Sequence, residues 1–311
     1  MDVSVIIPCY NADKFIGTAV QSVLNQTARA DEIIVVDDGS TDSSAEILRG
    51  VSNHVQLIQI AHTGLPASVR NVGIEASKGQ LIAFLDADDV WDSRKLEKQI
   101  KIFQERAEAT LVCTDIRLID EEGRHLGDSD YSSWTRSQFR SLMKNPLATL
   151  LQGNVVSTST VMVRRNKFLE AGLFVVSREL DQAEDYATWV KLAFQGGFYV
   201  IEEPLVSYRI GSSNISFQKV SEEVHRRRMA AMAELWCSYY CKRARLLDDT
   251  SYIMLIKRGV EAAKYRFMNI QLLDAVRMIR LLVLTVLHRL FGKRSAWFHA
   301  ATLKGLAGKA S

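Results

Sequence analysis

Three carboxylates follow a short apolar run in the first third of the chain. Residues 81–85 carry no charge, and Asp86, Asp88 and Asp89 come directly after them. Like charges held a few ångströms apart raise one another's pKa, so three acids at the end of a buried strand require a nearby cation. Because their ligand atoms are all oxygen, the pattern predicts a hard divalent ion, Mg²⁺ or Mn²⁺.

The spacing of Asp86 and Asp88 suits such an ion. Residues i and i+2 of an extended chain point to the same side. Mg²⁺ usually takes one or two protein carboxylates and leaves positions for substrate phosphates. The alternative is an acidic turn that caps a helix expected to start near Ser93. Two acids with this spacing more often form such a turn, so these residues alone leave both interpretations open.

The chain has no glycine-rich phosphate-binding motif. It lacks the GxGxxG sequence of dinucleotide-binding folds and the GxxxxGK[ST] sequence of P-loop proteins. A phosphate site in an α/β fold without these loops needs another source of positive charge. We expect a metal ion on Asp88, assisted by Arg70, to provide it.

Apolar runs and helical spacings alternate through the first 90 residues and predict an α/β fold. Such a pattern forms a mostly parallel sheet flanked by helices, through right-handed crossovers. The expected strands are 3–7, 32–36, 55–60 and 81–85, and the expected helices are 13–24, about 41–48 and 65–76. Ligands of these sheets bind beyond the carboxyl ends of the strands, where the polar clusters 9–11, 37–39 and 86–89 are expected to lie.

The middle of the chain has a mixed pattern. It predicts strands at 109–116, 159–163, 199–201 and 206–208, a helix at 184–194 and a polar, mobile loop at 121–134. Beyond residue 217 the pattern is helical, with turn signals near Asp248 and Gly292. We therefore expect one domain over 1–216 and a helical C-terminal region over 217–311.

The composition is that of an ordinary folded protein. Of 311 residues, 47% are hydrophobic and 24% charged, and the net charge of +3 is too small by itself to indicate a nucleic-acid partner. The four cysteines form no CxxC pair and no zinc-spaced cluster, so we expect reduced, packed thiols. Nothing resembles a signal peptide or a membrane-spanning run of about 18 apolar residues, which predicts a cytoplasmic location.

Four ordered segments resemble the family 2 glycosyltransferases of bacterial surface glycans, which have the Rossmann-like GT-A fold. They are VSVIIPCYN (3–11), EIIVVDDGSTD (32–42), GLPASVRNVGIEASKGQLIAFLDADD (64–89) and AEDYATWVKLA (183–193). The resemblance covers about residues 2–210. It implies a hexosyl- or N-acetylhexosaminyltransferase that moves a sugar from a nucleotide diphosphate, most often UDP, to a hydroxyl of a glycan or lipid-linked acceptor. Cell-surface polysaccharide or lipopolysaccharide synthesis is the implied process.

The resemblance also implies roles for the polar clusters. Pro8, Tyr10 and Asn11 would lie along the base and ribose. Asp38 would accept a hydrogen bond from the uracil, and Asp37 would orient the turn. The other implied nucleotide contacts are Arg70 at the base or diphosphate, Asp86 at the ribose hydroxyls, the adjacent Ala87, and Arg209 at a phosphate. Asp88 would hold the metal that bridges both phosphates.

The pair Glu184-Asp185 opens a predicted helix, where acids are also favourable against the helix dipole. The resemblance implies that Asp185 is the catalytic base and that Glu184 positions the acceptor, so that one displacement inverts the anomeric centre. Many members have a metal-binding histidine at the position of Gly211, whose absence here leaves a third ligand to water or another residue. Trp189 is expected in the core, and Asn71 is expected to cap or pack its helix.

The last seventy residues are strongly basic. From Lys242 onward, fourteen Lys or Arg face four acids, a net charge of +10, and the preceding 241 residues carry −7. Residues 276–291 are apolar on most faces, with Arg277 and Arg280 near one end. This predicts either a peripheral helix at the inner membrane face, where lipid-linked acceptors reside, or a packed helical region or oligomer contact.

Two other functions stay open. A nucleotidyltransferase also presents paired acids to a metal and a nucleotide, but it would not need Glu184-Asp185 and would release pyrophosphate. A non-catalytic relative would bind sugar nucleotides or glycans without transfer, against which the intact acids at both places argue.

Overall fold

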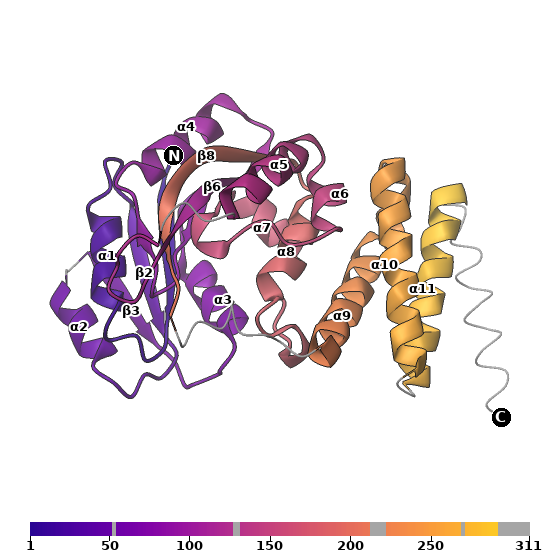
Figure 1. Cartoon of the computed structure of the whole chain (residues 1–311), viewed down its shortest axis with the longest axis horizontal. Coiled ribbons are helices and arrows are strands. Elements are labelled where there is room, and N and C mark those ends of the chain that lie inside the picture. Colours follow the sequence, from indigo (N-terminus) through magenta and orange to yellow (C-terminus); the bar gives the residue numbers. More distant parts are fainter. Residues whose placement is uncertain (52–53, 127–130, 212–221, 269–270, 292–311) are drawn as a thin grey trace. The chain divides into compact units, whose positions relative to one another are not determined.

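The computed structural model describes residues 1–51, 54–126, 131–211, 222–268 and 271–291. The chain divides into two compact units, Met1–Lys219 and Val220–Ser311, which are coloured indigo to orange and orange to yellow in Figure 1. The first unit is α/β and contains every predicted site residue.

An eight-stranded sheet forms the centre of the first unit, in the order β3-β2-β1-β4-β7-β6-β8-β5. Its strands are β1 (Val3–Cys9), β2 (Glu32–Asp37), β3 (Val55–Gln59), β4 (Leu81–Phe84), β5 (Val90–Trp91), β6 (Ala109–Ile119), β7 (Met162–Arg164) and β8 (Gly197–Arg209). The neighbours β3-β2-β1-β4 and β6-β8 pair in parallel, whereas β7 and β5 pair antiparallel. The predicted mostly parallel α/β fold is confirmed.

Eight helices of the first unit are described. They are α1 (Ile16–Leu24), α2 (Ser44–Val51), α3 (Pro66–Ala76), α4 (Lys95–Glu105), α5 (Tyr131–Lys144), α6 (Pro146–Leu150), α7 (Arg165–Ala171) and α8 (Glu184–Leu192). Two described 3₁₀ turns, η1 (Thr158–Thr160) and η2 (Arg178–Leu180), lie between them.

The alternation of side chains along β2 explains how the helices cover the sheet. Ile33 and Val35 join the core that contains α1 and α4 residues, whereas Ile34 and Val36 pack with Val69 of α3. Successive side chains of a strand point to opposite faces, so helices must cover both. Gly73 permits the close approach of α3, because a Cβ there would lie 2.6 Å from Cγ2 of Ile6.

Several predicted boundaries were wrong. The two short strands expected at 199–201 and 206–208 are one strand, β8, whose register against β6 is irregular near Thr114–Ile116. The strand expected from 159 begins only at Met162, because residues 158–160 form the turn η1. The first helix begins at Ile16 rather than 13, and the second begins at Ser44 rather than near Thr41.

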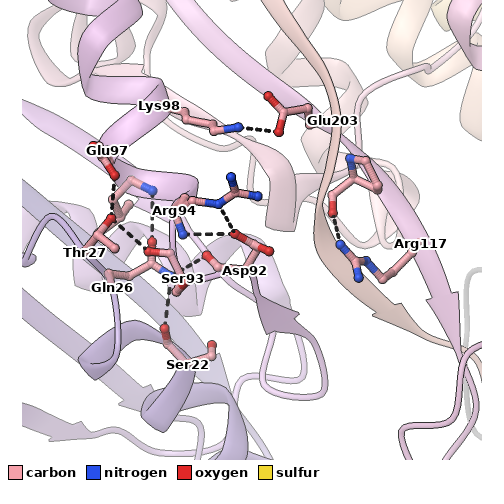
Figure 2. A network of polar contacts seen from close by, with 12 residues as sticks. Ser22, Gln26, Thr27, Asp92, Ser93, Arg94, Glu97, Lys98, Arg117 and Glu203 are labelled. Atoms are coloured by element: carbon pink, nitrogen blue, oxygen red, sulfur yellow. Dashed lines mark hydrogen bonds and ion pairs between the residues drawn. The ribbon is translucent and has the colours of Figure 1, made fainter.

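A polar network fastens the end of α1 to the segment that follows the acidic cluster (Figure 2). The Gln26 amide donates to the carbonyl of Asp92 at 2.7 Å and accepts from the N–H of Leu96 at 3.0 Å. The N–H of Thr27 donates to the carbonyl of Ser93. The segment before α4 and the start of that helix are therefore held against the residues that follow α1, which limits movement of the preceding turn.

The second unit is helical, as predicted. Its described elements are α9 (Glu222–Tyr240), η4 (Cys241–Leu246), α10 (Asp249–Met268) and α11 (Leu272–Phe291). A Cβ on Gly259 of α10 would meet Leu282 of α11 at 2.5 Å, so these helices pack closely. The division of this region into α10, which ends at Met268, and α11, which begins at Leu272, was not predicted, and Gly292 lies outside the described residues.

The helices of the described part of the chain are too short or too polar for any of them to cross a bilayer. All four cysteines are buried and free, as expected from their spacing.

Candidate active site

The carboxyl ends of β1, β2 and β4 lie at one edge of the sheet because the three strands are parallel neighbours. Each end carries one of the polar clusters: Tyr10-Asn11 follows β1, Asp37-Asp38 begins with the last residue of β2, and Asp86 to Asp89 lies after β4. The structure therefore brings together the clusters that the strand pattern places at this edge.

The acidic segment after β4 is a turn rather than an extended chain. The N–H of Asp89 donates to the carbonyl of Asp86 at 3.2 Å, so the argument from i and i+2 residues of a strand was wrong. Asp89 is 1% exposed and accepts from the N–H of Arg209 at 3.0 Å. Asp89 is thus an internal anchor between the turn and β8. Burial, with the neighbouring Asp88 and Asp86 charges, raises its pKa well above the ordinary value.

Asp88 lies between these two acids and is partly exposed. Burial and the charge of Asp86 raise the pKa of Asp88 to about 6. Burial and the Asp86 charge thus disfavour the ionised form of the Asp88 carboxylate. A bound cation would stabilise that ionised form.

Arg70 of α3 joins this turn to the second acidic pair. Its guanidinium lies 2.7 Å from Asp86 and 2.8 Å from Glu184, and it stands 5.5 Å from the centre of the Phe174 ring. The Arg70 side chain is only 7% exposed. Both terminal nitrogens are therefore engaged with carboxylates, and the predicted contact of Arg70 with a nucleotide stays a prediction.

Glu184 and Asp185 form the first turn of α8. Glu184 is 5% exposed, and its Oε2 atom has no hydrogen-bond partner within the described ranges. Asp185 is partly exposed; its Oδ2 atom accepts from the Thr158 hydroxyl at 3.0 Å, and its Oδ1 atom accepts from the N–H of Tyr186. Burial and the Glu184 charge raise the pKa of Asp185 to about 7, against the effect of Arg70. A carboxylate with this pKa can accept a proton near neutral pH.

The aspartates after β2 hold two neighbouring loops. Asp37 is fully buried and accepts hydrogen bonds from the N–H of Ser40 and the amide of Gln59. Asp38 accepts from the N–H groups of Thr63 and Gly64 at 2.8 and 3.0 Å. These contacts define structural roles, and the contact of Asp38 with a base stays a prediction.

An exposed aromatic pair lies beside Asp38. The Tyr10 ring stacks on His62 with centroids 4.2 Å apart, and His62 Nδ1 lies 3.1 Å from the Asp38 carboxylate. Tyr10 is 47% exposed, so part of its ring can contact a ligand. His62 was not predicted as a site residue, because a lone histidine after a strand carries little information.

Pro8 and Asn11 flank Tyr10. Pro8 is paired with Val36 inside the sheet. The Asn11 side chain accepts from the N–H of Thr41 at 2.8 Å and thereby links the loops after β1 and β2. Ala87 lies within the acidic turn and packs against the main core.

Arg209 of β8 contacts the acidic turn and is 6% exposed. Its Nε atom donates to the carbonyl of Asp88 at 2.8 Å, and its Nη1 atom donates to the carbonyls of Asp120 and Glu121. Phe15 and Arg209 line a neighbouring cavity of about 400 Å³. Of the predicted site residues, Arg209 alone is among the described residues that line this cavity. The contact of Arg209 with a phosphate stays a prediction.

A side chain at position 211 would not fit without movement of Glu121. A Cβ on Gly211 would lie 2.6 Å from Oε1 of Glu121. The remainder of the loop, Ser212 to Ser216, lies outside the described residues.

The carboxylate oxygens of the acidic turn fit a hard cation whose remaining ligands come from the substrate. No group of three or more His, Cys, Asp or Glu side chains able to hold a metal occurs in the described segments. Asp88, with Asp86 as a neighbour, offers carboxylate oxygens only, which suits Mg²⁺ or Mn²⁺ completed by phosphates.

An aromatic cluster lies beneath the Arg70 bridge. Trp189 is fully buried, as expected, and its ring contacts Phe84, Phe168 and Phe174 at centroid distances of 5.6 to 6.3 Å. Asn71 exchanges two hydrogen bonds with the main chain of Phe174, which holds this ring under Arg70.

Comparison with known proteins finds a matching family and several relatives. The family described as Glycosyl transferase family 2 matches residues 4–171. An uncharacterized glycosyltransferase of Rickettsia bellii is 33% identical over 69% of this chain, which spans only 30% of that protein's length. The putative teichuronic acid biosynthesis glycosyltransferase TuaG of Bacillus subtilis is 30% identical over 78% of this chain and 95% of its own.

A solved structure shares the fold. The crystal structure of S. aureus TarS 1-349 in complex with UDP-GlcNAc superimposes with a TM-score of 0.61 at 17% identity, over 93% of this chain and 92% of that one.

Proposed function

The chain belongs to glycosyl transferase family 2, and we propose that it transfers a sugar from a nucleoside diphosphate to a hydroxyl group during synthesis of a cell-surface polysaccharide. The observation that carries this proposal is the Arg70 bridge, since it holds Asp86 and Glu184 in a single site. The acidic turn after β4 would then contact the donor, and the pair Glu184-Asp185 would contact the acceptor. The names of the relatives, including a teichuronic acid enzyme, support the polysaccharide class.

We favour a UDP-sugar as the donor, carrying a hexose or an N-acetylhexosamine. The TarS neighbour, whose structure contains UDP-GlcNAc, supports this choice. Tyr10, with Pro8 and Asn11, would line the base and ribose, and Asp86 would accept from ribose hydroxyls. Asp88 would hold Mg²⁺ or Mn²⁺, which when bound offsets the charge that develops on the departing diphosphate.

Asp185 would act as the general base. A sugar hydroxyl is a weak nucleophile at neutral pH, and a carboxylate within hydrogen-bond reach removes its proton as it attacks. Its raised pKa, about 7, supports this role. Glu184 would orient the acceptor, because its buried Oε2 atom accepts no hydrogen bond from the described residues. One displacement with one base inverts the anomeric centre, so an α-linked donor would give a β-glycoside.

We further propose a peripheral contact of the second unit with an anionic membrane surface on the cytoplasmic side. The outward face of α11 exposes Leu273, Val276, Ile279, Val283, Val286 and Leu290 by 37% to 87%. Arg277 lies beside this stripe, and the unit is strongly basic, which favours anionic lipid over a second basic copy. A lipid-linked acceptor would be reached at such a surface.

Product analysis tests the proposed reaction. The protein is incubated with a panel of UDP-sugars, Mn²⁺ and extracts of candidate acceptors, and the released nucleotide is identified. Release of UDP with a sugar transferred to an acceptor is expected. Release of pyrophosphate would instead identify a nucleotidyltransferase, and binding of a UDP-sugar without turnover would indicate a non-catalytic relative.

A further inference from the structure

The turn η1 contacts both acidic groups of the site. The Thr158 hydroxyl donates to Oδ2 of Asp185 at 3.0 Å, and the Ser159 hydroxyl accepts from the N–H of Asp86 at 3.1 Å. Adjacent residues of one short turn thus connect the two acidic groups by a route that does not include Arg70.

Core contacts hold this turn in place. Thr158, Ser159 and Thr160 are 5%, 0% and 1% exposed. The Trp91 indole N–H donates to the carbonyl of Ser159, and the Gln99 amide donates to the carbonyl of Thr160, each at 2.8 Å. Because buried donors and acceptors are expensive to leave unpaired, these bonds restrict where the Thr158 hydroxyl can point.

Two hydrogen bonds from described residues orient the Asp185 carboxylate. One oxygen accepts from the main-chain N–H of Tyr186, and the other accepts from Thr158. The charged groups that face it are Glu184 on its own helix and Arg70 on α3, whose other partner is Asp86. Thr158 is therefore the neutral side chain that holds Oδ2, the oxygen not committed to the main chain.

We propose that Thr158 is a positioning residue of the transfer reaction, whose hydroxyl directs the Asp185 carboxylate toward the acceptor hydroxyl. This inference rests on the proposed role of Asp185 as base. A hydroxyl that donates to a carboxylate also favours its ionised form. Loss of the hydroxyl should thus raise the pKa of Asp185 and turn the carboxylate away from its working orientation.

The first test is the titration of Asp185 in full-length protein labelled with ¹³C at aspartate carboxyl carbons, assigned by comparison with Asp185→Asn. Thr158→Val should raise the apparent pKa of Asp185 by roughly one unit, whereas Thr158→Ser should leave it near the wild-type value. Thr160→Val is the matched control, since the Thr160 hydroxyl donates to the carbonyl of Ser157 at 2.6 Å rather than to Asp185. An unchanged titration in Thr158→Val would overturn the proposal.

The second test follows release of UDP from UDP-N-acetylglucosamine as a function of pH. Thr158→Val should lower kcat at pH 7 by roughly 10-fold, leave KM for the donor unchanged and shift the acidic limb to higher pH, and Thr158→Ser should restore all three. A variant that only loses thermal stability, with the limb unmoved, would show a structural role and overturn the inference. Because titration does not require turnover, failure of the base assignment itself would appear separately, as full activity of Asp185→Asn.

Discussion

Arg70 and Glu184 form a buried ion pair, 2.8 Å between Nη1 and Oε1, although 114 residues separate them in the chain. Both side chains are 7% exposed. Since Arg70 also binds Asp86, this pair sets the distance between the acidic turn after β4 and the start of α8. The stability of the first unit should therefore depend on this pair.

Replacing Arg70 with Met should destabilise the first unit by about 3 kcal/mol, because a buried carboxylate is left without its partner. Urea unfolding measures this change. The double variant Arg70→Met/Glu184→Leu should recover part of the loss. Arg94→Met is the control: this arginine pairs with Asp92 at the surface, its side chain is 54% exposed, and its replacement should change stability by less than about 0.5 kcal/mol. Equal stability of Arg70→Met and Arg94→Met would contradict the prediction.

Asp185→Asn should keep donor binding and lose at least about 100-fold in transfer, because the amide cannot accept the acceptor's proton. Donor binding is measured as thermal stabilisation by UDP with Mn²⁺, and transfer as product formed. Asp181→Asn makes the same chemical change four residues earlier in the chain and should leave transfer intact. Wild-type transfer by Asp185→Asn would exclude Asp185 as the base.

The raised pKa of Asp185, about 7, also predicts how its contribution to stability depends on pH. The unfolded chain releases this proton near pH 4, whereas the folded protein retains it up to about 7. The folded state therefore binds more protons in that window, and its stability falls as pH rises through it. Asp185→Asn should raise Tm by a few degrees at pH 8.5 and leave it nearly unchanged at pH 4. Thermal denaturation at the two pH values decides this; equal shifts at both would be inconsistent with a raised pKa.

Removal of metal should weaken nucleotide binding through Asp88. Calorimetry with UDP should give tighter binding in Mn²⁺ than in chelator for the wild type, and Asp88→Ala should bind UDP equally in both. Asp92→Ala, which removes a carboxylate four residues later, should behave as the wild type. If UDP binds the wild-type protein with the same affinity in chelator, Asp88 has no role in a metal site.

The outward face of α11 predicts lipid-dependent sedimentation. The triple variant Val276→Gln, Ile279→Gln, Val283→Gln should lose most of its cosedimentation with phosphatidylglycerol vesicles, because each change removes apolar area from the contact. Ile253→Gln, at a residue of α10 that is 64% exposed, is the control. A triple variant that pellets like the wild type would contradict the prediction. A change of oligomeric state in scattering experiments without vesicles would assign the face to a second copy.

Local patterns were sufficient for the fold class. Apolar runs such as residues 81–85 and the helical spacing of residues 65–76 identified β4 and α3 almost to their ends. They failed within the STST sequence of residues 157–160, because residues 159 and 160 were predicted to begin a strand. The Thr158 hydroxyl donates to the Asp185 carboxylate, the Ser159 hydroxyl accepts from the main-chain N–H of Asp86, and the Thr160 hydroxyl donates to the turn's own main chain, so the segment forms a turn instead.

The sequence by itself determined that polar clusters lie at the ends of β1, β2 and β4 on one edge, with acids in the second and third cluster, because parallel neighbouring strands must end together. Only the tertiary structure decided which of those acids have an ion-pair or hydrogen-bond partner, and which residue provides it. Arg70 meets Asp86 and Glu184, Asp89 meets the main chain of Arg209, and Thr158 meets Asp185. These partners lie between 16 and 120 residues apart, and they meet because α3, η1, β8 and α8 pack around the same turn. Periodicity along the chain reports which face of an element is buried, but it contains no information on which distant side chain will lie against that face.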